Sequence, residues 1–217
     1  MSRRTTRIIA VTSLVFGAAA LLAPPAHADQ RSALKVLQSL KTAPERSAGY
    51  DRDLFPHWDY VGDDCDVRDR VLITEARRGP STGNSCPVGS GRWFSAFDGV
   101  TVRDPSALDI DHMVPLAEAW GSGARRWSTA LRESFANDLG YAGSLIAVTA
   151  SSNRSKGDQD PAQWLPPRIS YRCTYVSEWI VVKWRWRLTV DPAEKAALRV
   201  QITACGDPRV SLPARAR

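Results

Sequence analysis

Four cysteines constrain the fold of this chain more than any other feature of its sequence. They are Cys65, Cys86, Cys173 and Cys205. An even number of cysteines in an exported chain indicates two disulfides, and four cysteines allow three pairings. We favour Cys65 with Cys86 and Cys173 with Cys205, because each of these pairs encloses one local segment. A zinc site is the other use of four cysteines, but the CxxC spacing of such sites is missing.

The N-terminal segment indicates that the protein is exported. Three arginines precede an apolar run, and a small-residue cleavage pattern follows it: Arg3, Arg4 and Arg7, residues 8–22, and Ala26-His27-Ala28. The run is about 15 residues long, shorter than the roughly 20 that span a bilayer. We therefore predict a signal peptide over residues 1–28 and a secreted, soluble protein with no membrane partner. The adjacent arginines are compatible with both general and twin-arginine export.

Residues 29–217 are long enough for one domain with its own hydrophobic core. Charge is distributed unevenly along them: residues 29–119 hold 11 Lys and Arg against 15 Asp and Glu, and residues 120–217 hold 15 against 8. A basic half beside an acidic half predicts a polyanion-binding face next to a carboxylate-bearing site. Ordinary solvation of a charged surface explains the same pattern equally well.

Hydrophobic periodicity predicts a mixed α+β fold. Residues 31–41 and 171–188 have helical spacing, and the capped start at 191–194 predicts a helix over 192–204. The dipeptide Asp98-Gly99, between extended runs at 92–97 and 100–103, predicts a hairpin. The tail from Gly206 is expected to be loose.

The centre of the chain is expected to alternate between strand and helix. A strand is predicted over 108–114, where apolar and acidic residues alternate before Pro115. A helix over 124–139, a short strand or helical turn over 145–149, and a helix ending at Gly157 follow. His112 therefore falls near the end of a strand, and His57 is the only other imidazole left once the signal peptide is removed.

Three separated blocks of the sequence carry a resemblance to a known protein family. They are DIDHMVPLAEAW at 109–120, FAND at 135–138 and SSNRSKGDQDPAQWLPP at 151–167, with YDRDLFPHW at 50–58 and CDVRDRVL at 65–72 extending the match. The sequence resembles the HNH (ββα-metal) endonucleases, especially the secreted branch with the GmrSD-type C-terminal nuclease domain. The resemblance implies a single disulfide-linked α+β domain. Its ββα-metal hairpin and helix would lie in a core over about 92–167, surrounded by further helices, including C-terminal helices over 171–204.

The resemblance also implies a role for each of four residues. Hydrolysis of a phosphodiester needs an activated water and neutralisation of charge on the phosphate and the leaving oxygen. By the resemblance, His112 is the general base, and Asp111 and Asn153 are ligands of one divalent metal ion. Oxygen ligands suit a hard ion, so we expect Mg²⁺, with Mn²⁺ as an acceptable substitute. Lys156, on the same helical face as Asn153, would contact a substrate phosphate, for which Arg154 is a weaker candidate.

Two features of the sequence do not fit this assignment. Successive side chains of a strand point to opposite faces, so Asp111 and His112 cannot both face one site from a regular strand. Asp109, on the face of Asp111, is an alternative ligand or a support for one. The middle asparagine of the HNH pattern is also missing, because Ser144 occupies its place. Asn137 would replace it only if the chain between the two strands folds back.

Each of these residues also has a purely structural interpretation. A lone Asp-His pair is most often a hydrogen-bonded surface feature, and a lone asparagine most often caps a helix or turn. The agreement of three blocks in order is what favours catalysis. His57 is interpreted as a packed histidine, Glu118 as a structural residue, and the tryptophans as core or rim residues rather than base-stacking platforms.

The sequence thus predicts a secreted, metal-dependent endonuclease, a monomer, that hydrolyses DNA or RNA with little sequence preference. The alternative is a catalytically silent extracellular module that binds polyanions or cell-wall polymer on the same scaffold. Ser144 supports the alternative, and a divalent ion at Asp111 and Asn153 would exclude it. A hydrolase of another bond would need a serine or cysteine nucleophile motif, which the sequence lacks. Strand preference and the natural substrate stay open.

Overall fold

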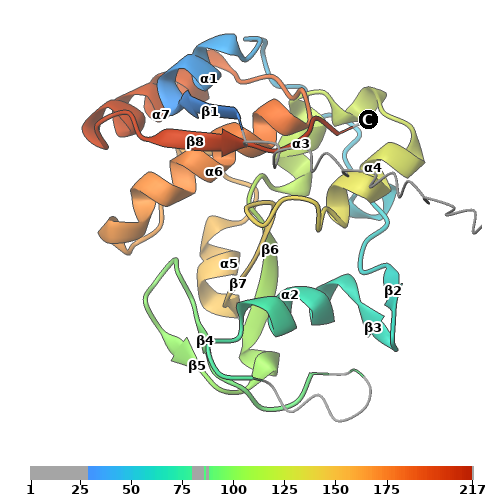
Figure 1. Ribbon diagram of the computed structural model, residues 1–217. Coiled ribbons are helices and arrows are strands. Elements are labelled where there is room, and N and C mark those ends of the chain that lie inside the picture. The colour runs from blue at the N-terminus through green and yellow to red at the C-terminus, as the bar shows by residue number, and fades with distance from the viewer. Residues whose placement is uncertain (1–28, 80–85, 87, 217) are drawn as a thin grey trace, which may run out of the picture.

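The computed structural model of this protein describes residues 29–79, 86 and 88–216 (Figure 1). The predicted signal peptide, residues 1–28, lies outside the described residues, as do residues 80–85 and 87, part of a Gly-, Ser- and Pro-rich stretch over 79–91 for which the sequence predicts a surface loop. The described part mixes helices with short antiparallel strand pairs, as the sequence predicts for an α+β fold. Within it, no helix has the length and apolar character needed to cross a membrane.

Five of the helices gather at one end of the molecule, together with the two termini of the described chain (Figure 1). Their bounds are α1 Ala33–Ser39, α3 Leu116–Gly121, α4 Thr129–Ala136, α6 Arg172–Arg185 and α7 Pro192–Ala204. Strand β1 (Asp29–Ser32) pairs antiparallel with β8 (Arg209–Leu212) against these helices. Buried side chains from each of these five helices form one hydrophobic cluster, with Tyr175, Trp179 and Ile180 of α6 fully buried inside it.

A smaller part of the molecule lies at the opposite end and has its own hydrophobic cluster. It contains α2 (Val67–Glu75), the strand pair β2 (Tyr60–Gly62) and β3 (Cys65–Asp66), and the pair β4 (Trp93–Phe94) and β5 (Thr101–Val102). The second cluster includes Leu72 of α2 and Trp93 of β4. The indole of Trp93 donates a hydrogen bond to the Leu72 carbonyl (2.7 Å), which holds β4 against α2.

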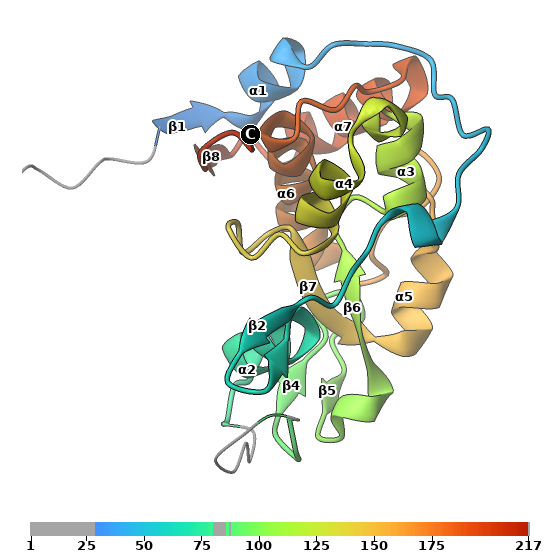
Figure 2. The same cartoon turned by 90° about the vertical axis from the view of Figure 1, so that its right-hand side faces the viewer.

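A strand pair and the helix that follows it connect the two parts (Figure 2). Strands β6 (Leu108–His112) and β7 (Leu145–Thr149) pair antiparallel, from Leu108 opposite Thr149 to His112 opposite Leu145. One face of the pair is apolar and packs towards α2 through residues such as Ile110 and Ala147. The opposite face carries Asp109 and Asp111 towards α5 (Ala150–Lys156), because successive side chains of a strand alternate between its faces.

Asp98, in the predicted tight turn, holds the start of α5 in place. Gly99 adopts a left-handed conformation (φ 81°), which the turn between β4 and β5 requires. The Asp98 carboxylate accepts hydrogen bonds from the hydroxyls of Thr149 and Ser152, in the first turn of α5. These hydrogen bonds lower the pKa of Asp98 despite its partial burial. The hairpin over 93–102 therefore positions the helix that carries two of the predicted site residues.

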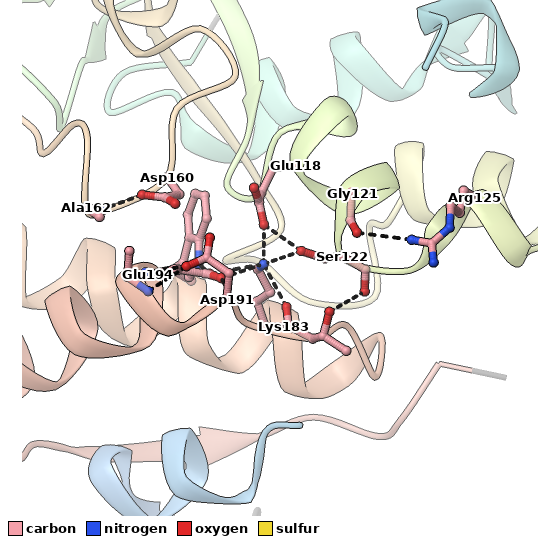
Figure 3. Close-up of polar contacts among 12 residues, drawn as sticks. Glu118, Gly121, Ser122, Arg125, Asp160, Ala162, Lys183, Asp191 and Glu194 are labelled. Carbon is pink, nitrogen blue, oxygen red and sulfur yellow. Dashed lines mark hydrogen bonds and ion pairs between the residues drawn. The ribbon is translucent and has the colours of Figure 1, made fainter. Parts of the chain in front are cut away.

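A buried lysine ties α3 to the C-terminal helices (Figure 3). The Lys183 ammonium of α6 is fully buried and contacts the carboxylates of Glu118 in α3 and Glu194 in α7. It also donates to the Ser122 hydroxyl (2.7 Å) and the Thr189 carbonyl (2.9 Å). Glu118 thus has the structural role expected for it. Because α3 begins just after the strand that carries His112, this network also holds the segment that follows His112 in place.

Several local predictions are confirmed. The disulfides are Cys65–Cys86 and Cys173–Cys205, the pairing that we favoured. Helix α7 begins with the predicted capping box, in which the side chains of Asp191 and Glu194 each accept from the other's backbone N–H. Helix α5 ends at Gly157, whose φ is 53°. Residues 145–149, for which we predicted either a short strand or a helical turn, form strand β7.

Two local predictions are wrong. The single helix expected over 124–139 is a short 3₁₀ turn, η3 (Ala124–Arg126), and the separate helix α4, because Trp127 is extended and Ser128 caps a new helix. The tail beyond Gly206 is not loose, since residues 209–212 form β8. Its partner strand lies at the other end of the described chain, so no local pattern indicates the pairing.

Candidate active site

A polar pocket of about 310 Å³ lies at the end of β6, beside the start of α3 and the last turn of α5. The lining residues come from four segments: Arg52; Ile110, Asp111 and His112; Pro115 and Leu116; and Asn153, Arg154, Gly157 and Asp158. Three of the four predicted site residues, His112, Asp111 and Asn153, therefore line one pocket. The fourth, Lys156, is buried beside it.

Asp111 and His112 both reach this pocket although they are neighbours in a regular strand. Strand β6 pairs with β7 on one side only among the described strands, so its other edge is open. His112 is the last residue of the strand. A pocket at the open edge and the end of a strand is accessible from both of its faces, which removes the geometric objection raised by the sequence.

The imidazole of His112 is held on three sides. Its Nε2–H donates a hydrogen bond to the Ala136 carbonyl at the end of α4 (2.9 Å). The indole of Trp58 stacks on one face of the ring (centroids 5.9 Å apart) and Phe135 lies against it at 6.4 Å. Burial lowers the pKa of His112 to about 3, so the ring is neutral near pH 7. With the proton on Nε2, Nδ1 carries the lone pair that a general base needs.

The segment over 55–59 that supplies Trp58 has a strained backbone. Trp58 has a φ of 64°, a left-handed conformation that costs roughly 1–2 kcal/mol for a residue with a side chain. The Asn137 side chain, at the end of α4, holds this segment: its amide donates to the Pro56 carbonyl (3.1 Å), and its oxygen accepts from Asp59 N–H (3.1 Å). The amide also donates to Glu133 O (2.9 Å) within α4.

Neither residue considered for the middle asparagine contacts His112 through its side chain. The Ser144 hydroxyl donates instead to the Asp138 carboxylate (2.7 Å). Asn137 acts on the segment next to His112, and the group that contacts the imidazole is a backbone carbonyl, that of Ala136. Sequence reasoning missed both Ala136 and Trp58. The aromatic run around Trp58 was a signal for an ordered segment, but no pattern marks a carbonyl.

Lys156 forms a buried ion pair with Asp111 instead of facing solvent. Its ammonium lies 2.6 Å from Asp111 Oδ2 and donates to the His112 carbonyl at 2.7 Å. Lys156 has no exposed surface, and Asp111 is only 5% exposed. Burial raises the pKa of Asp111, and the Lys156 ammonium opposes this shift. In this arrangement Lys156 holds the two predicted site residues of β6, so a direct contact with a substrate phosphate would require it to move.

Asn153 faces the carboxylates of β6 from the middle of α5. Its Nδ2 donates to Asp109 Oδ2 (3.0 Å), so its amide oxygen is the atom available to a metal ion. Asp111 uses Oδ2 for Lys156, which leaves Oδ1. Carboxylate and amide oxygens in this combination fit a hard divalent ion, which takes one or two carboxylates and completes its shell with water or phosphate. Asp109 thus joins the predicted ligands as a neighbour that orients Asn153.

Two arginines add positive charge to the pocket. Arg52 lies opposite α5 and its guanidinium donates to His57 Nε2 (3.4 Å). His57 has its proton on Nδ1, which donates to the Phe55 carbonyl (2.8 Å), and it therefore supports Arg52. Arg154 is exposed and lines the pocket from α5. The sequence did not distinguish Arg52 from other arginines, whereas the structure places it among the site residues.

Another group of metal-binding residue types lies far from this pocket in the fold. Ligand atoms of Cys65, Asp69 and Cys86 lie within 4.8 Å of one another. Both sulfurs belong to one disulfide, however, and a disulfide cannot supply the thiolates that bind soft metals. The Asp69 carboxylate is also engaged by the Asp66 N–H in the capping box of α2. This group is therefore a disulfide beside a helix cap.

Comparisons with known proteins identify the family. Residues 68–200 match the family described as GmrSD restriction endonucleases, C-terminal domain. A protein of Arthroderma benhamiae, described as an uncharacterized secreted protein, is 45% identical over 183 residues, which cover 84% of this chain and 89% of that protein. No solved structure is similar to the chain. The matched residues include β6, β7 and α5, with all the pocket residues except Arg52. The chain belongs to the family of the C-terminal domain of GmrSD restriction endonucleases.

Proposed function

We propose that this protein is a secreted, metal-dependent endonuclease that hydrolyses phosphodiester bonds of DNA or RNA with little sequence preference. In this proposal β6, β7 and α5 form the ββα unit of an HNH nuclease. The observation that carries it is the neutral His112 imidazole, with its Nδ1 lone pair, in one pocket with Asp111 and Asn153. The disulfides and the secreted relative support action outside the cell, after removal of residues 1–28.

The oxygens of Asp111 and Asn153 would hold a divalent ion, Mg²⁺ or Mn²⁺, with Asp109 orienting Asn153. Such an ion supplies positive charge to the scissile phosphate and to the leaving oxygen. Lys156 compensates the charge of Asp111, so Asp109 and Asp158 supply the remaining negative charge beside the ion, opposite the positive charges of Arg52 and Arg154. This balance of charges suits a divalent ion whose coordination shell includes phosphate oxygens, rather than an ion that is coordinated by protein groups alone.

His112 would remove a proton from the attacking water through Nδ1. The hydrogen bond from Nε2 to Ala136 fixes the tautomer and stabilises the imidazolium that forms, because a carbonyl accepts more strongly from a charged ring. Trp58 and Phe135 prevent the ring from rotating. Arg52 and Arg154 would neutralise the phosphate from the solvent side of the pocket. The contact from Ala136 supports catalysis over a silent binding module, since it can orient the base in place of the missing asparagine side chain.

Cleavage assays with matched variants test the proposal. The oxidised protein from residue 29 onwards is incubated with supercoiled plasmid, single-stranded DNA and RNA in Mg²⁺ or Mn²⁺. We expect cleavage that EDTA abolishes and that His112→Ala lowers by about 10²–10⁴-fold, the usual contribution of a general base. Asp111→Asn should weaken Mn²⁺ binding measured by calorimetry, whereas Asp104→Asn, the same change at an exposed helix cap, should not.

Cleavage that persists in EDTA, or that a folded His112→Ala variant catalyses at the wild-type rate, would refute the proposed site. No cleavage in either metal, together with no metal binding, would support the silent binding module. Light scattering of the same preparation tests the expected monomer. Comparing the initial rates on the three polymers gives the substrate preference that the sequence leaves open.

A further inference from the structure

Three arginines meet at the C-terminal end of α3, outside the pocket. The Gly121 carbonyl accepts from the backbone N–H of Arg46 (3.2 Å) and from the Arg125 guanidinium (3.3 Å), which brings the two residues together. Arg126 follows Arg125 in the 3₁₀ turn η3. Figure 3 shows Arg125 directed back towards Gly121. Arg46 and Arg126 are exposed and Arg125 is half-buried. We call Arg46, Arg125 and Arg126 the α3 arginine cluster.

No carboxylate neutralises this cluster in the part of the chain that the structure describes. None of its three arginines forms an ion pair there. The Glu45 carboxyl lies beside Gly121. A hydrogen bond with Glu118, helped by partial burial, raises the pKa of Glu45 to about 8, so this carboxyl is mostly uncharged at neutral pH. Burial and the charges of Arg126 and Arg46 also lower the pKa of Arg125, as expected for crowded cations.

Stabilisation of a helix end explains only one of these arginines. A guanidinium at the C-terminal carbonyls of a helix is favourable, and Arg125 has this contact. Arg46 uses only its backbone N–H at Gly121, and the Arg126 side chain is exposed. Placing these two additional charges near Arg125 is unfavourable for folding. The fold thus keeps a concentrated positive charge that its own stability does not require.

The α3 arginine cluster lies close to the candidate active site. Pro115 and Leu116, at the start of α3, line the pocket, and Gly121 is the last residue of the helix. Six residues at a rise of about 1.5 Å each give a separation of about 9 Å along the axis. One strand of a duplex advances about 3.4 Å per nucleotide, so this separation corresponds to two or three nucleotides.

The surface between the cluster and the pocket is the segment over 46–52. The Trp120 indole donates to the Ala48 carbonyl (3.2 Å), and the Tyr50 ring packs on the Trp120 ring with centroids 6.4 Å apart. This packing fixes the segment on α3, and the segment ends at Arg52, in the pocket. Asp51 interrupts the positive charge between them, but its carboxylate is used to cap η1 (Arg52–Leu54). The positive charge is therefore concentrated at the two ends of this segment, at the α3 arginine cluster and at Arg52 in the pocket.

We propose that the α3 arginine cluster binds backbone phosphates of a polynucleotide two or three nucleotides from the bond cleaved in the pocket. The inference rests on the proposed function of that pocket and specifies its substrate as a polymer of several nucleotides. The arginines contact phosphates and not base edges, so they add affinity without sequence preference. Their contribution decreases with salt, because neutralised phosphates release counterions.

Equilibrium binding without catalysis tests the inference. Binding of a fluorescein-labelled 20-base-pair duplex is followed by anisotropy in EDTA at several salt concentrations. Each lost phosphate contact lowers the slope of log K against log salt by about 0.9. The triple variant Arg46→Gln, Arg125→Gln, Arg126→Gln should therefore reduce the slope by about 2–3. It should also reduce the advantage of the 20-mer over a three-nucleotide strand.

A charge-matched variant provides the control. Lys35, Lys41 and Arg199 are exposed cations on or beside α1 and α7, and changing all three to Gln removes the same charge. We expect this variant to bind and cleave like the wild type. An equal loss in both variants, or an unchanged slope in the triple arginine variant of unchanged thermal stability, would overturn the inference. Because binding is measured in EDTA, a wild-type protein that binds but does not cleave would refute the proposed function and not the α3 arginine cluster.

Discussion

Replacing Asn137 with alanine should loosen the imidazole of His112, the proposed base, although the Asn137 side chain does not contact it. The Asn137 side chain links α4 to the segment over 55–59 through the Pro56 carbonyl and the Asp59 N–H. A net hydrogen bond contributes about 1 kcal/mol, so losing these two and the bond to Glu133 O removes about 2–3 kcal/mol. The strain at Trp58, roughly 1–2 kcal/mol, would be relieved at the same time. We therefore expect the free energy of unfolding to fall by only about 1–2 kcal/mol.

The effect on His112 should be larger than this loss of stability suggests. Without the links from Asn137, the strain at Trp58 is no longer opposed, and the 55–59 segment should favour an ordinary backbone conformation. The indole then leaves the His112 ring, which keeps its contact with Phe135 and its hydrogen bond to the Ala136 carbonyl but loses the aromatic ring on its other side. If the present orientation of the His112 ring becomes about 1.4 kcal/mol less stable than its other orientations, only about a tenth of the molecules hold the ring in place. The value of kcat then falls about tenfold.

Two measurements on the same variant separate orientation from general destabilisation. Urea unfolding gives the free energy, and ¹⁵N NMR of the imidazole shows whether the proton of His112 stays on Nε2. Ser144→Ala is the matched control, since its hydroxyl contacts Asp138 and not the 55–59 segment. If Asn137→Ala loses stability but keeps the His112 tautomer and the wild-type kcat, Asn137 does not orient His112 and the reasoning is wrong.

Two further predictions concern buried charges. Lys156→Met leaves Asp111 buried without its ammonium, so the free energy of unfolding at pH 7 should fall by about 3–5 kcal/mol; a fall below about 1 kcal/mol in urea unfolding would show that the pair is not needed. Burial raises the pKa of Glu75 to about 7, although the Ala147 N–H donates to its carboxylate and opposes this. Folding therefore favours protonated Glu75, and its stabilising contribution is complete below pH 4.5 and is lost as pH rises through 7. The corresponding free energy is about 3 kcal/mol, or about 2 kcal/mol allowing for partial exposure. Glu75→Gln should accordingly be more stable than the wild type at pH 8 and equal to it at pH 4, and an equal difference at both pH values would contradict the shift.

The sequence was sufficient wherever neighbouring residues determine the structure. The turn at Asp98-Gly99, the capping box of α7 and the end of α5 at Gly157 each depend on a few consecutive residues, and all were predicted. Both disulfides also join positions that enclose one local segment. The family blocks brought His112, Asp111 and Asn153 together as candidates, and the structure places all three around one pocket.

The tertiary structure decided what depends on residues far apart in the chain. The tail becomes a strand only because β1 lies beside it, and Lys156 points inward because Asp111 and the His112 carbonyl provide buried partners that compensate the loss of water. The group that orients His112 is a backbone carbonyl of α4, which every residue type carries. A sequence specifies side chains, whereas the position of a carbonyl is known only after the chain between the two strands has folded back onto the site.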